Sequence, residues 1–286
     1  VFFLLYVFTK EPFVGVICVL FVIAQLIAES ILGASEAGIK KELMEYVIAI
    51  VVALVFFYGL VFFLNTGAPL DAVVSCSMLP NLERGDMVVL KGEKPKAEVV
   101  YVSRAEWERR KVGWNSTYFD CNALGKRDAC KKLKDVILQN ITLEESDGLF
   151  NFTYGQCAYR KNGEKEVGLC VHYLKIGDKE IRENTENDII VYDPKEGDYF
   201  YYRSKPIIHR VALVVDVEGE RHYITKGDNN PVYDIQWGNS PVREGNIHGK
   251  VIMRIPYVGY AKILLSSILN PSLLFTPVGC DIVKEN

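Results

Sequence analysis

The sequence has no excess of basic residues, since 33 Lys and Arg stand against 36 Asp and Glu for a formal net charge of −3. A chain with this balance lacks the basic patches that bind nucleic acid, and we expect no nucleic-acid partner. The seven cysteines contain no CxxC pair and no Cys/His spacing typical of zinc sites, so we predict no metal site and no cofactor. The chain also has no internal repeat and no low-complexity tract.

Two long apolar runs lie near the N-terminus. Residues 13–32 carry one charge, Glu29, near the end, and residues 46–64 carry none. Each run matches the ~20 residues that a helix needs to cross a bilayer. Buried core helices are the alternative, but uncharged runs of this length are rare in soluble domains. We therefore predict two transmembrane helices over residues 13–64, after an apolar N-terminal stub at residues 1–12.

The loop between the two runs predicts their orientation. It contains Lys40 and Lys41, and lysines favour the cytoplasmic side of a membrane. Everything after residue 64 is then expected to be extracytoplasmic, in the ER lumen or on a prokaryotic cell surface.

The polar middle of the chain, residues 91–186, combines two features of exported proteins. It contains three Asn-x-Ser/Thr sequons and four clustered cysteines: Asn115, Asn140, Asn151, Cys121, Cys130, Cys157 and Cys170. Disulfides persist in oxidising compartments, and glycan acceptors need a translocated segment. We predict an inserted α+β subdomain, stapled by disulfides and glycosylated. The alternative is a set of buried free thiols and unused sequons.

The remaining sequence predicts β-structure. Short runs rich in Val, Ile and Tyr, bounded by Gly, Pro, Asp or Asn, occur at residues 86–90, 188–192, 199–203, 207–215, 221–225 and 250–254. Short strands without an intervening helical pattern favour an antiparallel barrel or sandwich. We expect this β core to comprise residues 65–90 and 187–259.

The C-terminal tail, residues 260–286, is apolar but interrupted. Lys262, Ser266 and Asn270 recur at helical spacing on one face, and Pro271 ends the pattern. This pattern favours a segment lying at the membrane interface. A third, poor span is the alternative.

Four residues offer the chemistry of amide hydrolysis by a serine, which needs a base, a group that orients the base and donors for the oxyanion. Ser77 is the nucleophile candidate. His209 is the base candidate, because a histidine titrates near neutrality. Asp228 and Asp234 are candidates to orient it. The plainer interpretations are an exposed serine turn, a packed histidine and an Asx turn.

Four sequence blocks in a fixed order give these candidates a context. They are residues 75–80 with 85–86, residues 188–192 leading to 208–211, residues 226–230 with 234, and residues 255–260. In these blocks the chain resembles type I signal peptidases, in particular the archaeal and ER-type branch. The resemblance implies a β-rich catalytic fold at the membrane surface, which would bind preprotein signal peptides and cleave them after small residues, with accessory membrane subunits as further expected partners.

The resemblance also implies roles for individual residues. Ser77 falls on the family's nucleophile, and Ser75 and Ser77 fall on the oxyanion hole. His209 stands where bacterial members have a lysine base. Asp228 and Asp234 match the two family aspartates, and we favour Asp234 as the residue that orients His209.

Three features depart from the family pattern. Cys76 lies between the two serines, where it is either a small filler or an alternative nucleophile. Residues 91–186 exceed the family's minimal core, and two spans precede the serine instead of one. Lys205 and Lys226 adjoin polar or turn residues and are expected to be solvated, which disfavours a lysine base.

The sequence thus favours a membrane-bound serine endopeptidase that removes signal peptides. Two alternatives remain at this point. One is a non-catalytic, membrane-anchored binding protein with a glycosylated ectodomain, since binding often resides on inserted loops. The other is a related peptidase that matures other secreted precursors.

Overall fold

The computed structural model describes residues 39–111, 115–203, 205–275, 277 and 280–285, together with positions 17, 21, 24, 25, 28 and 29. The predicted stub, residues 1–12, and most of the first predicted span, residues 13–32, lie outside the described residues. The chain divides by its contacts into two compact units. The first comprises Val1–Ser75, Arg84–Gly92 and Ile252–Val278, and the second Cys76–Glu83, Glu93–Val251 and Gly279–Asn286.

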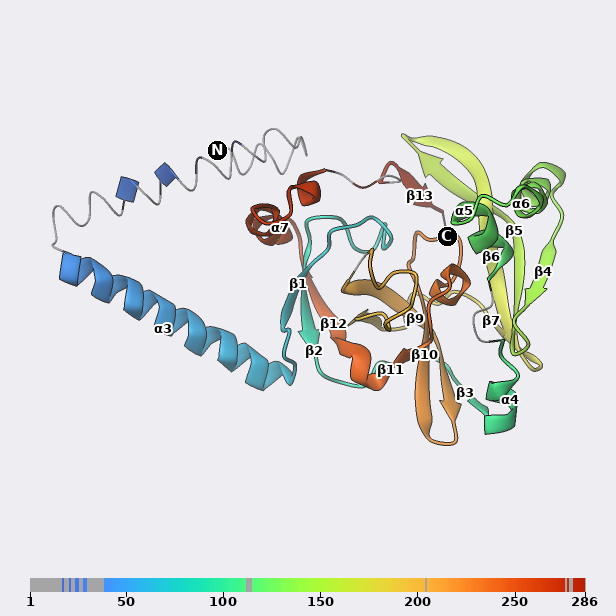
Figure 1. Cartoon of the computed structure of the whole chain (residues 1–286), viewed down its shortest axis with the longest axis horizontal. Helices are drawn as coiled ribbons and strands as arrows, with labels where there is room; N and C mark the ends of the chain where they lie inside the picture. Colours follow the sequence, from blue (N-terminus) through green and yellow to red (C-terminus); the bar gives the residue numbers. More distant parts are fainter. Residues whose placement is uncertain are drawn as a thin grey trace. The chain divides into compact units, whose positions relative to one another are not determined.

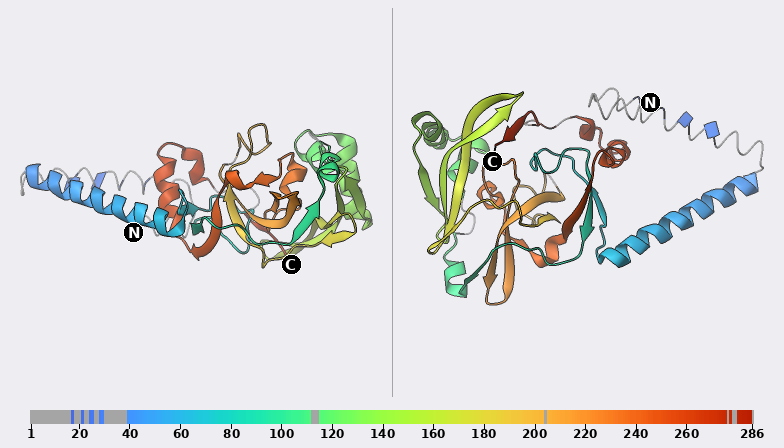
Figure 2. Two further views of the ribbon diagram at one scale, coloured as in Figure 1. Left: turned by 90° about the horizontal axis from the view of Figure 1, so that it is seen from below. Right: turned by 180° about the vertical axis from the view of Figure 1, so that it is seen from behind.

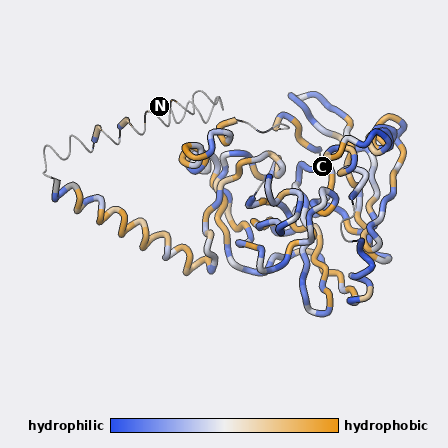
Figure 3. Tube along the Cα trace, viewed as in Figure 1, coloured by the Kyte–Doolittle hydropathy of each residue, from blue (hydrophilic) through white to orange (hydrophobic). Residues whose placement is uncertain are grey.

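Among the described residues, the first unit contains one long apolar helix, α3, over Ile39–Leu64. Its apolar stretch, Leu43–Leu64, has 22 residues, none of them buried within the protein. At 1.5 Å per residue this stretch is about 33 Å long, close to the ~30 Å of a hydrocarbon core. Most of the α3 tube is orange in Figure 3, and the blue residues lie at its start. The helix is consistent with a membrane anchor and includes the second predicted span, residues 46–64.

The rest of the first unit is a small antiparallel pair covered by a helix. Strand β1, Leu70–Ala72, pairs with β2, Met87–Lys91. Helix α7, Gly259–Ser267, and the 3-10 turn η3, Pro271–Leu274, complete a small core with β1. Within the tail, Lys262 pairs with Asp71 at 2.6 Å. The interfacial position of the tail stays a prediction.

The first sheet of the second unit carries the site. Strands β12, β8, β9, β10 and β11 are antiparallel neighbours in that order, and β3 pairs with β9 in parallel (Figure 1). Their bounds are Val99–Val102 for β3, Ile189–Tyr192 for β8, Ile207–Val217 for β9, Glu220–Lys226 for β10, Val242–Arg243 for β11 and Ile247–Ile255 for β12. The last residues of β12 belong to the first unit.

The β9–β10 hairpin shows why these residues pair as they do. Its two turn residues, Glu218 and Gly219, have φ angles of 53° and 95°. Two residues with positive φ form the tight turn whose twist matches that of paired strands, and glycine adopts this conformation without strain. The Asp216 carboxylate accepts the Gly219 N–H at 2.7 Å and fixes the turn.

The second sheet comes from the chain's middle and its end. Strands β13, β5, β6 and β7 are neighbours in that order, and β4 pairs with β5; β5 and β6 form the long yellow-green hairpin of Figure 2. The bounds are Leu143–Ser146 for β4, Phe150–Lys161 for β5, Glu164–Ile176 for β6, Lys179–Ile181 for β7 and Ile282–Lys284 for β13. The preceding helices are α4, Arg104–Glu108, α5, Thr117–Asn122, and α6, Arg127–Gln139.

The two sheets of the second unit share one hydrophobic core. Phe150 and Phe152 of β5 are fully buried in the same cluster as Leu213 and Val215 of β9 and Ile224 of β10. The structure therefore does not separate residues 91–186 as a subdomain of their own, and that boundary stays a prediction. The antiparallel sheets confirm the β-rich part of the predicted fold class.

The four clustered cysteines form two disulfides. Cys121 of α5 bonds to Cys130 of α6, and Cys157 of β5 bonds to Cys170 of β6. This outcome agrees with the expectation of an oxidising compartment. The sequon asparagines Asn115, Asn140 and Asn151 are all exposed, and their glycosylation stays a prediction.

The predicted strand over residues 199–203 is wrong. The segment forms consecutive turns, in which the Tyr201 N–H donates to Asp198 O and the Arg203 N–H donates to Phe200 O. Its aromatic residues pack as a cluster instead of alternating across a sheet, with Tyr199 stacked on Trp237 at 5.5 Å. The strand prediction failed here because it relied on the aromatic content of the segment, and these aromatic side chains pack as a cluster over turns.

Candidate active site

Ser77, His209 and Asp234 form a continuous hydrogen-bonded relay within the second unit. His209 Nδ1 lies 2.7 Å from Asp234 Oδ2, and His209 Nε2 lies 3.0 Å from Ser77 Oγ. Because a carboxylate only accepts, Nδ1 carries the proton and Nε2 presents its lone pair to the serine hydroxyl. His209 and Asp234 are buried, whereas Ser77 is half-buried and accessible. This geometry allows the imidazole to take the hydroxyl proton.

Three neighbouring strands hold the buried end of the relay. His209 lies on β9, Tyr192 on β8 and Thr225 on β10. Tyr192 Oη donates to Asp234 Oδ2 at 2.9 Å, and Thr225 Oγ1 donates to the same oxygen at 2.6 Å. With the imidazole, this oxygen accepts three hydrogen bonds, which fix the carboxylate at the start of η1, Asp234–Trp237.

The phenol of Tyr192 is suited to that role. Burial and the neighbouring Asp234 carboxylate raise the pKa of Tyr192 well above its usual range. The group therefore stays protonated and remains a hydrogen-bond donor to Asp234. Neither Tyr192 nor Thr225 was among the candidates from the sequence, although both lie in strands that the sequence predicts.

The serine turn is held by the loop that follows β10. The Asn229 N–H donates to the main-chain oxygen of Ser77 at 2.8 Å, and Asn229 Nδ2 donates to the Cys76 oxygen at 3.2 Å. Gly227 lies so close that a Cβ atom there would stand 2.7 Å from the Ser77 oxygen. A residue without a side chain is therefore required at Gly227, and this explains why the sequence places glycine against the serine.

A disulfide fixes the same turn to the end of the chain. Cys76 bonds to Cys280, 204 residues later in the sequence. Both interpretations of Cys76 from the sequence are therefore wrong, because its sulfur is neither a filler nor a free nucleophile. Strand β13, which follows Cys280, also contacts the loop that holds the serine turn, because the Lys284 N–H donates to Asn229 Oδ1 at 2.7 Å. Asn229 thus connects the serine turn with the C-terminal strand.

Asp228, the second aspartate candidate, lies in a different ion pair. Arg210 Nε and Nη2 donate to its two carboxylate oxygens, each at 2.8 Å, and Asn81 Nδ2 donates to Oδ2 at 2.7 Å. Arg210 also donates to the main-chain oxygen of Asn187 at 2.6 Å. Asp228 therefore connects three chain segments near the site, whereas Asp234 contacts the imidazole directly.

The expectation that Lys226 is solvated is wrong. Its side chain is 4% exposed, and its ammonium pairs with Glu183 at 2.9 Å. Burial and the neighbouring Lys284 lower the pKa of Lys226 to about 8, against the opposing effect of Glu183. Lys284 shares Glu183 at 2.6 Å. The sequence could not show this, because the acid that allows the burial lies on a distant segment. Lys205 is exposed, as expected from the sequence.

The oxyanion-hole residues stay predictions. Ser77 lies at the turn described above, whereas Ser75 belongs by its contacts to the first unit.

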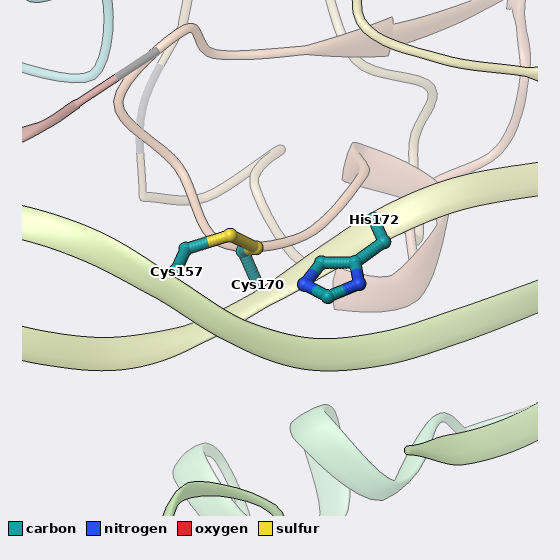
Figure 4. A group of neighbouring side chains, drawn as sticks. All are labelled: Cys157, Cys170 and His172. Carbon is teal, nitrogen blue, oxygen red and sulfur yellow. A yellow bond between two sulfur atoms is a disulfide. The ribbon is translucent and has the colours of Figure 1, made fainter. Parts of the chain in front are cut away.

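Within the described part of the chain, one group of side chains has ligand atoms close enough for a metal ion. In Figure 4, Cys157, Cys170 and His172 lie together, with their sulfur and nitrogen atoms within 4.8 Å of one another. The two sulfurs are joined as a disulfide, and His172 Nε2 donates to the Gln156 oxygen at 2.9 Å. Metal ligation requires free thiolates, so this group does not fit a metal in its disulfide form.

Comparison with known proteins relates the chain to one group of enzymes. No family model matches the chain. It is 34% identical over 89 residues to the signal peptidase complex catalytic subunit SEC11 of Verticillium alfalfae, a match that covers 30% of this chain and 48% of the relative. Part of this chain is homologous to the catalytic subunits of ER-type signal peptidases. The SEC11 subunit of Schizosaccharomyces pombe is 36% identical over 83 residues, which cover 28% of this chain and 41% of the relative.

The homology to SEC11 is partial, because the chain spans less than half the length of these relatives. A longer match is found with an uncharacterised protein of Methanocaldococcus jannaschii, which is 26% identical over 211 residues, or 72% of this chain and 87% of the relative.

Proposed function

We propose that the protein is a membrane-bound serine endopeptidase that removes signal peptides from secreted and membrane preproteins. The observation that supports this most strongly is the relay Ser77–His209–Asp234, found in a chain with partial homology to SEC11. A buried aspartate, an imidazole and an accessible serine hydroxyl in series are the parts that serine acyl transfer uses.

In the proposed reaction, Ser77 Oγ attacks the scissile carbonyl while His209 Nε2 takes its proton. Asp234 holds the Nδ1–H tautomer and stabilises the imidazolium that forms. The imidazolium then returns the proton to the leaving amine, and a water molecule activated by His209 hydrolyses the acyl-enzyme. Donors at Ser75 and Ser77 are proposed to stabilise the oxyanion.

The substrate and its location follow from the helix that precedes the serine. Ser77 comes 13 residues after Leu64, the last residue of α3. A fully extended chain of that length reaches about 45 Å, so the serine stays near the membrane surface if α3 spans the bilayer. We propose that the second unit is extracytoplasmic, at an ER or archaeal plasma membrane, and that it cuts at the end of the substrate's apolar segment. Accessory membrane subunits are proposed by relation to the SEC11 complex.

The test is cleavage of a radiolabelled preprotein by the full chain in detergent or liposomes. The wild type is expected to release one mature product, identified by N-terminal sequencing at the signal-peptide boundary. Ser77→Ala is expected to reduce cleavage by at least about 10³-fold, while retaining the wild-type melting temperature. Cleavage by Ser77→Ala at the wild-type rate would overturn the proposal.

The same experiment separates the alternatives from the sequence. A preprotein that is bound but not cut by the wild type, with or without added microsomal or archaeal membrane subunits, supports a binding protein. Cleavage of other secreted precursors at sites far from an apolar segment supports a maturation peptidase. We favour the signal peptidase because the relay is complete and the homology is to that family.

A further inference from the structure

A cavity of about 190 Å³ lies in the second unit, apart from the serine turn. Its lining is rich in cations and includes Trp107, Arg110, Lys195, His222 and Arg243. We call it the Trp107 cavity. The lining also includes Tyr192, whose hydroxyl donates to Asp234 of the relay.

Trp107 organises two of the polar side chains. Arg110 stacks over the indole at 4.0 Å, and the His222 ring is stacked on it with centroids 4.4 Å apart. Such stacking holds a guanidinium and an imidazole in fixed orientations without using their N–H groups. The donors of both side chains therefore remain available.

Two of these nitrogen atoms are buried without a hydrogen bond in the described part of the chain. They are Arg110 Nη1 and His222 Nε2. The latter stands 3.5 Å from Glu220 Oε1, an ion-pair distance that does not meet hydrogen-bond geometry. His222 itself is only 3% exposed. Arg110 Nη1 is a donor, and His222 Nε2 is a donor in the tautomer that carries the proton there. A buried donor that lacks an acceptor is costly, so this pair indicates an acceptor that the folded chain alone does not supply.

The cations also lie close enough to repel one another. Burial lowers the pKa of Arg110, with Asp147 opposing this effect and Arg243 adding to it. Burial likewise lowers the pKa of His222, and the three arginines Arg243, Arg110 and Arg104 act in the same direction against Glu220. Like charges around one cavity are stabilised when an anion occupies it.

The acids that line or adjoin the cavity already have partners. The Asp198 carboxylate accepts the Ser240 N–H and hydroxyl at 2.9 and 2.8 Å. Asp193 pairs with His248 at 2.9 Å, and Asp147 accepts the N–H groups of Leu149 and Phe150. Glu220, the remaining acid, lies 3.6 Å from Arg104 and 3.9 Å from Arg243, whereas no carboxylate lies within ion-pair distance of Arg110 or Lys195 among the described residues.

We propose that the Trp107 cavity binds a phosphate monoester or free phosphate, through Arg110, Arg243 and Lys195 with His222 Nε2 as a further donor. The arginine fork matches the oxygens of a phosphate, and a group with two negative charges offsets several cations at once. The cavity volume of about 190 Å³ is smaller than the ~300–1,000 Å³ of sites that bind drug-sized ligands. The cavity therefore suits a small ligand such as a single tetrahedral anion. This site does not depend on the proposed peptidase function.

Two kinds of molecule could supply the bound phosphate group: free phosphate, and a lipid headgroup with a terminal phosphate. The test uses the full chain in detergent, titrated with inorganic phosphate in a calorimeter and by thermal melting. A parallel arm titrates the same detergent-solubilised chain with soluble headgroup analogues of phosphatidic acid and phosphatidylcholine. Glycerol 3-phosphate stands for the monoester headgroup and glycerophosphocholine for the diester.

Arg110→Gln and Arg243→Gln are the test variants, and Arg109→Gln is the matched control. Arg109 neighbours Arg110 in the chain, but it pairs with Glu106 on the surface. The Arg243 side chain is 66% exposed, so Arg243→Gln should leave the fold intact. This variant therefore keeps the test valid in the event that Arg110→Gln fails to fold.

The expected result is saturable binding that raises the melting temperature and weakens at least about tenfold in both test variants but not in Arg109→Gln. Binding of inorganic phosphate indicates the free source, and binding of glycerol 3-phosphate alone indicates the lipid headgroup. Absence of binding by both probes, or equal binding by the wild type and both test variants, would overturn the proposal.

Discussion

Removing the Cys76–Cys280 disulfide is expected to destabilise the second unit more than removing a local disulfide. The bond closes a segment of 204 residues, whereas Cys121–Cys130 closes one of 9. Loop-closure entropy gives about 5 kcal/mol for the long segment and about 2.5 kcal/mol for the short one at 25 °C. The loop-closure entropy depends on the logarithm of the number of residues in the closed loop. The shorter disulfides inside the long segment shorten that loop by too few residues to change its entropy noticeably.

The local contacts predict a different effect on activity. When both cysteines are replaced by serine, Asn229 still holds the main-chain oxygens of Ser77 and Cys76 at 2.8 and 3.2 Å. The relay should therefore survive at 25 °C, with cleavage reduced by less than about tenfold, if each hydrogen bond contributes about 1 kcal/mol. Loss of about 5 kcal/mol should lower the melting temperature by roughly 10–20 °C, about twice the decrease expected when a disulfide worth about 2.5 kcal/mol is lost.

The assay pairs thermal melting of the full chain in detergent with preprotein cleavage at 25 °C. The double variant Cys121→Ser/Cys130→Ser is the control for loss of any disulfide. Equal melting temperatures for the two double variants would refute the loop-closure reasoning. Complete loss of cleavage at 25 °C in a folded Cys76→Ser/Cys280→Ser protein would refute the role given to Asn229.

Three further outcomes are expected. Asp234→Asn should lower kcat about 10³–10⁴-fold at unchanged melting temperature, because an amide no longer fixes the His209 tautomer; a drop below tenfold would remove Asp234 from the relay. Gly227→Ala should lower kcat by displacing the serine turn, while Gly245→Ala, where a Cβ meets open space, should not; equal rates would contradict the close approach. Phe152→Ala, at a fully buried position, should cost about 3–5 kcal/mol in urea unfolding, and a cost below 1 kcal/mol would contradict the shared core.

The β core and the relay residues lay within reach of sequence reasoning for two different reasons. Runs of Val, Ile and Tyr between turn residues predicted β2, β8, β9, β10 and β12, because a pleated strand tolerates branched and aromatic side chains. Ser77, His209 and the two aspartates were candidates by their chemistry, and the resemblance to a known family placed them in one site and favoured Asp234 over Asp228. The hydrogen bonds that bring them together are a property of the fold.

Other features depended on contacts that no local pattern encodes. Cys76 gave no sign of its partner 204 residues away. Lys226 resembled a solvated turn residue, yet Glu183 from a distant segment permits its burial. The role of the Thr225 hydroxyl could not be predicted from the sequence, because it donates to Asp234 only in the folded sheet, where β10 pairs with β9. Each depends on pairing between segments, which composition and periodicity do not specify.

The most direct test of the relay is the rate at which an aryl fluorophosphonate labels Ser77, located by peptide mass spectrometry. The wild type and Lys226→Met should both be labelled at Ser77 at similar rates, because Lys284 continues to pair with Glu183. His209→Ala should be labelled about 10²–10⁴-fold more slowly, since the general base is lost. Labelling at another residue, or a rate that depends on Lys226 and not on His209, would contradict the account.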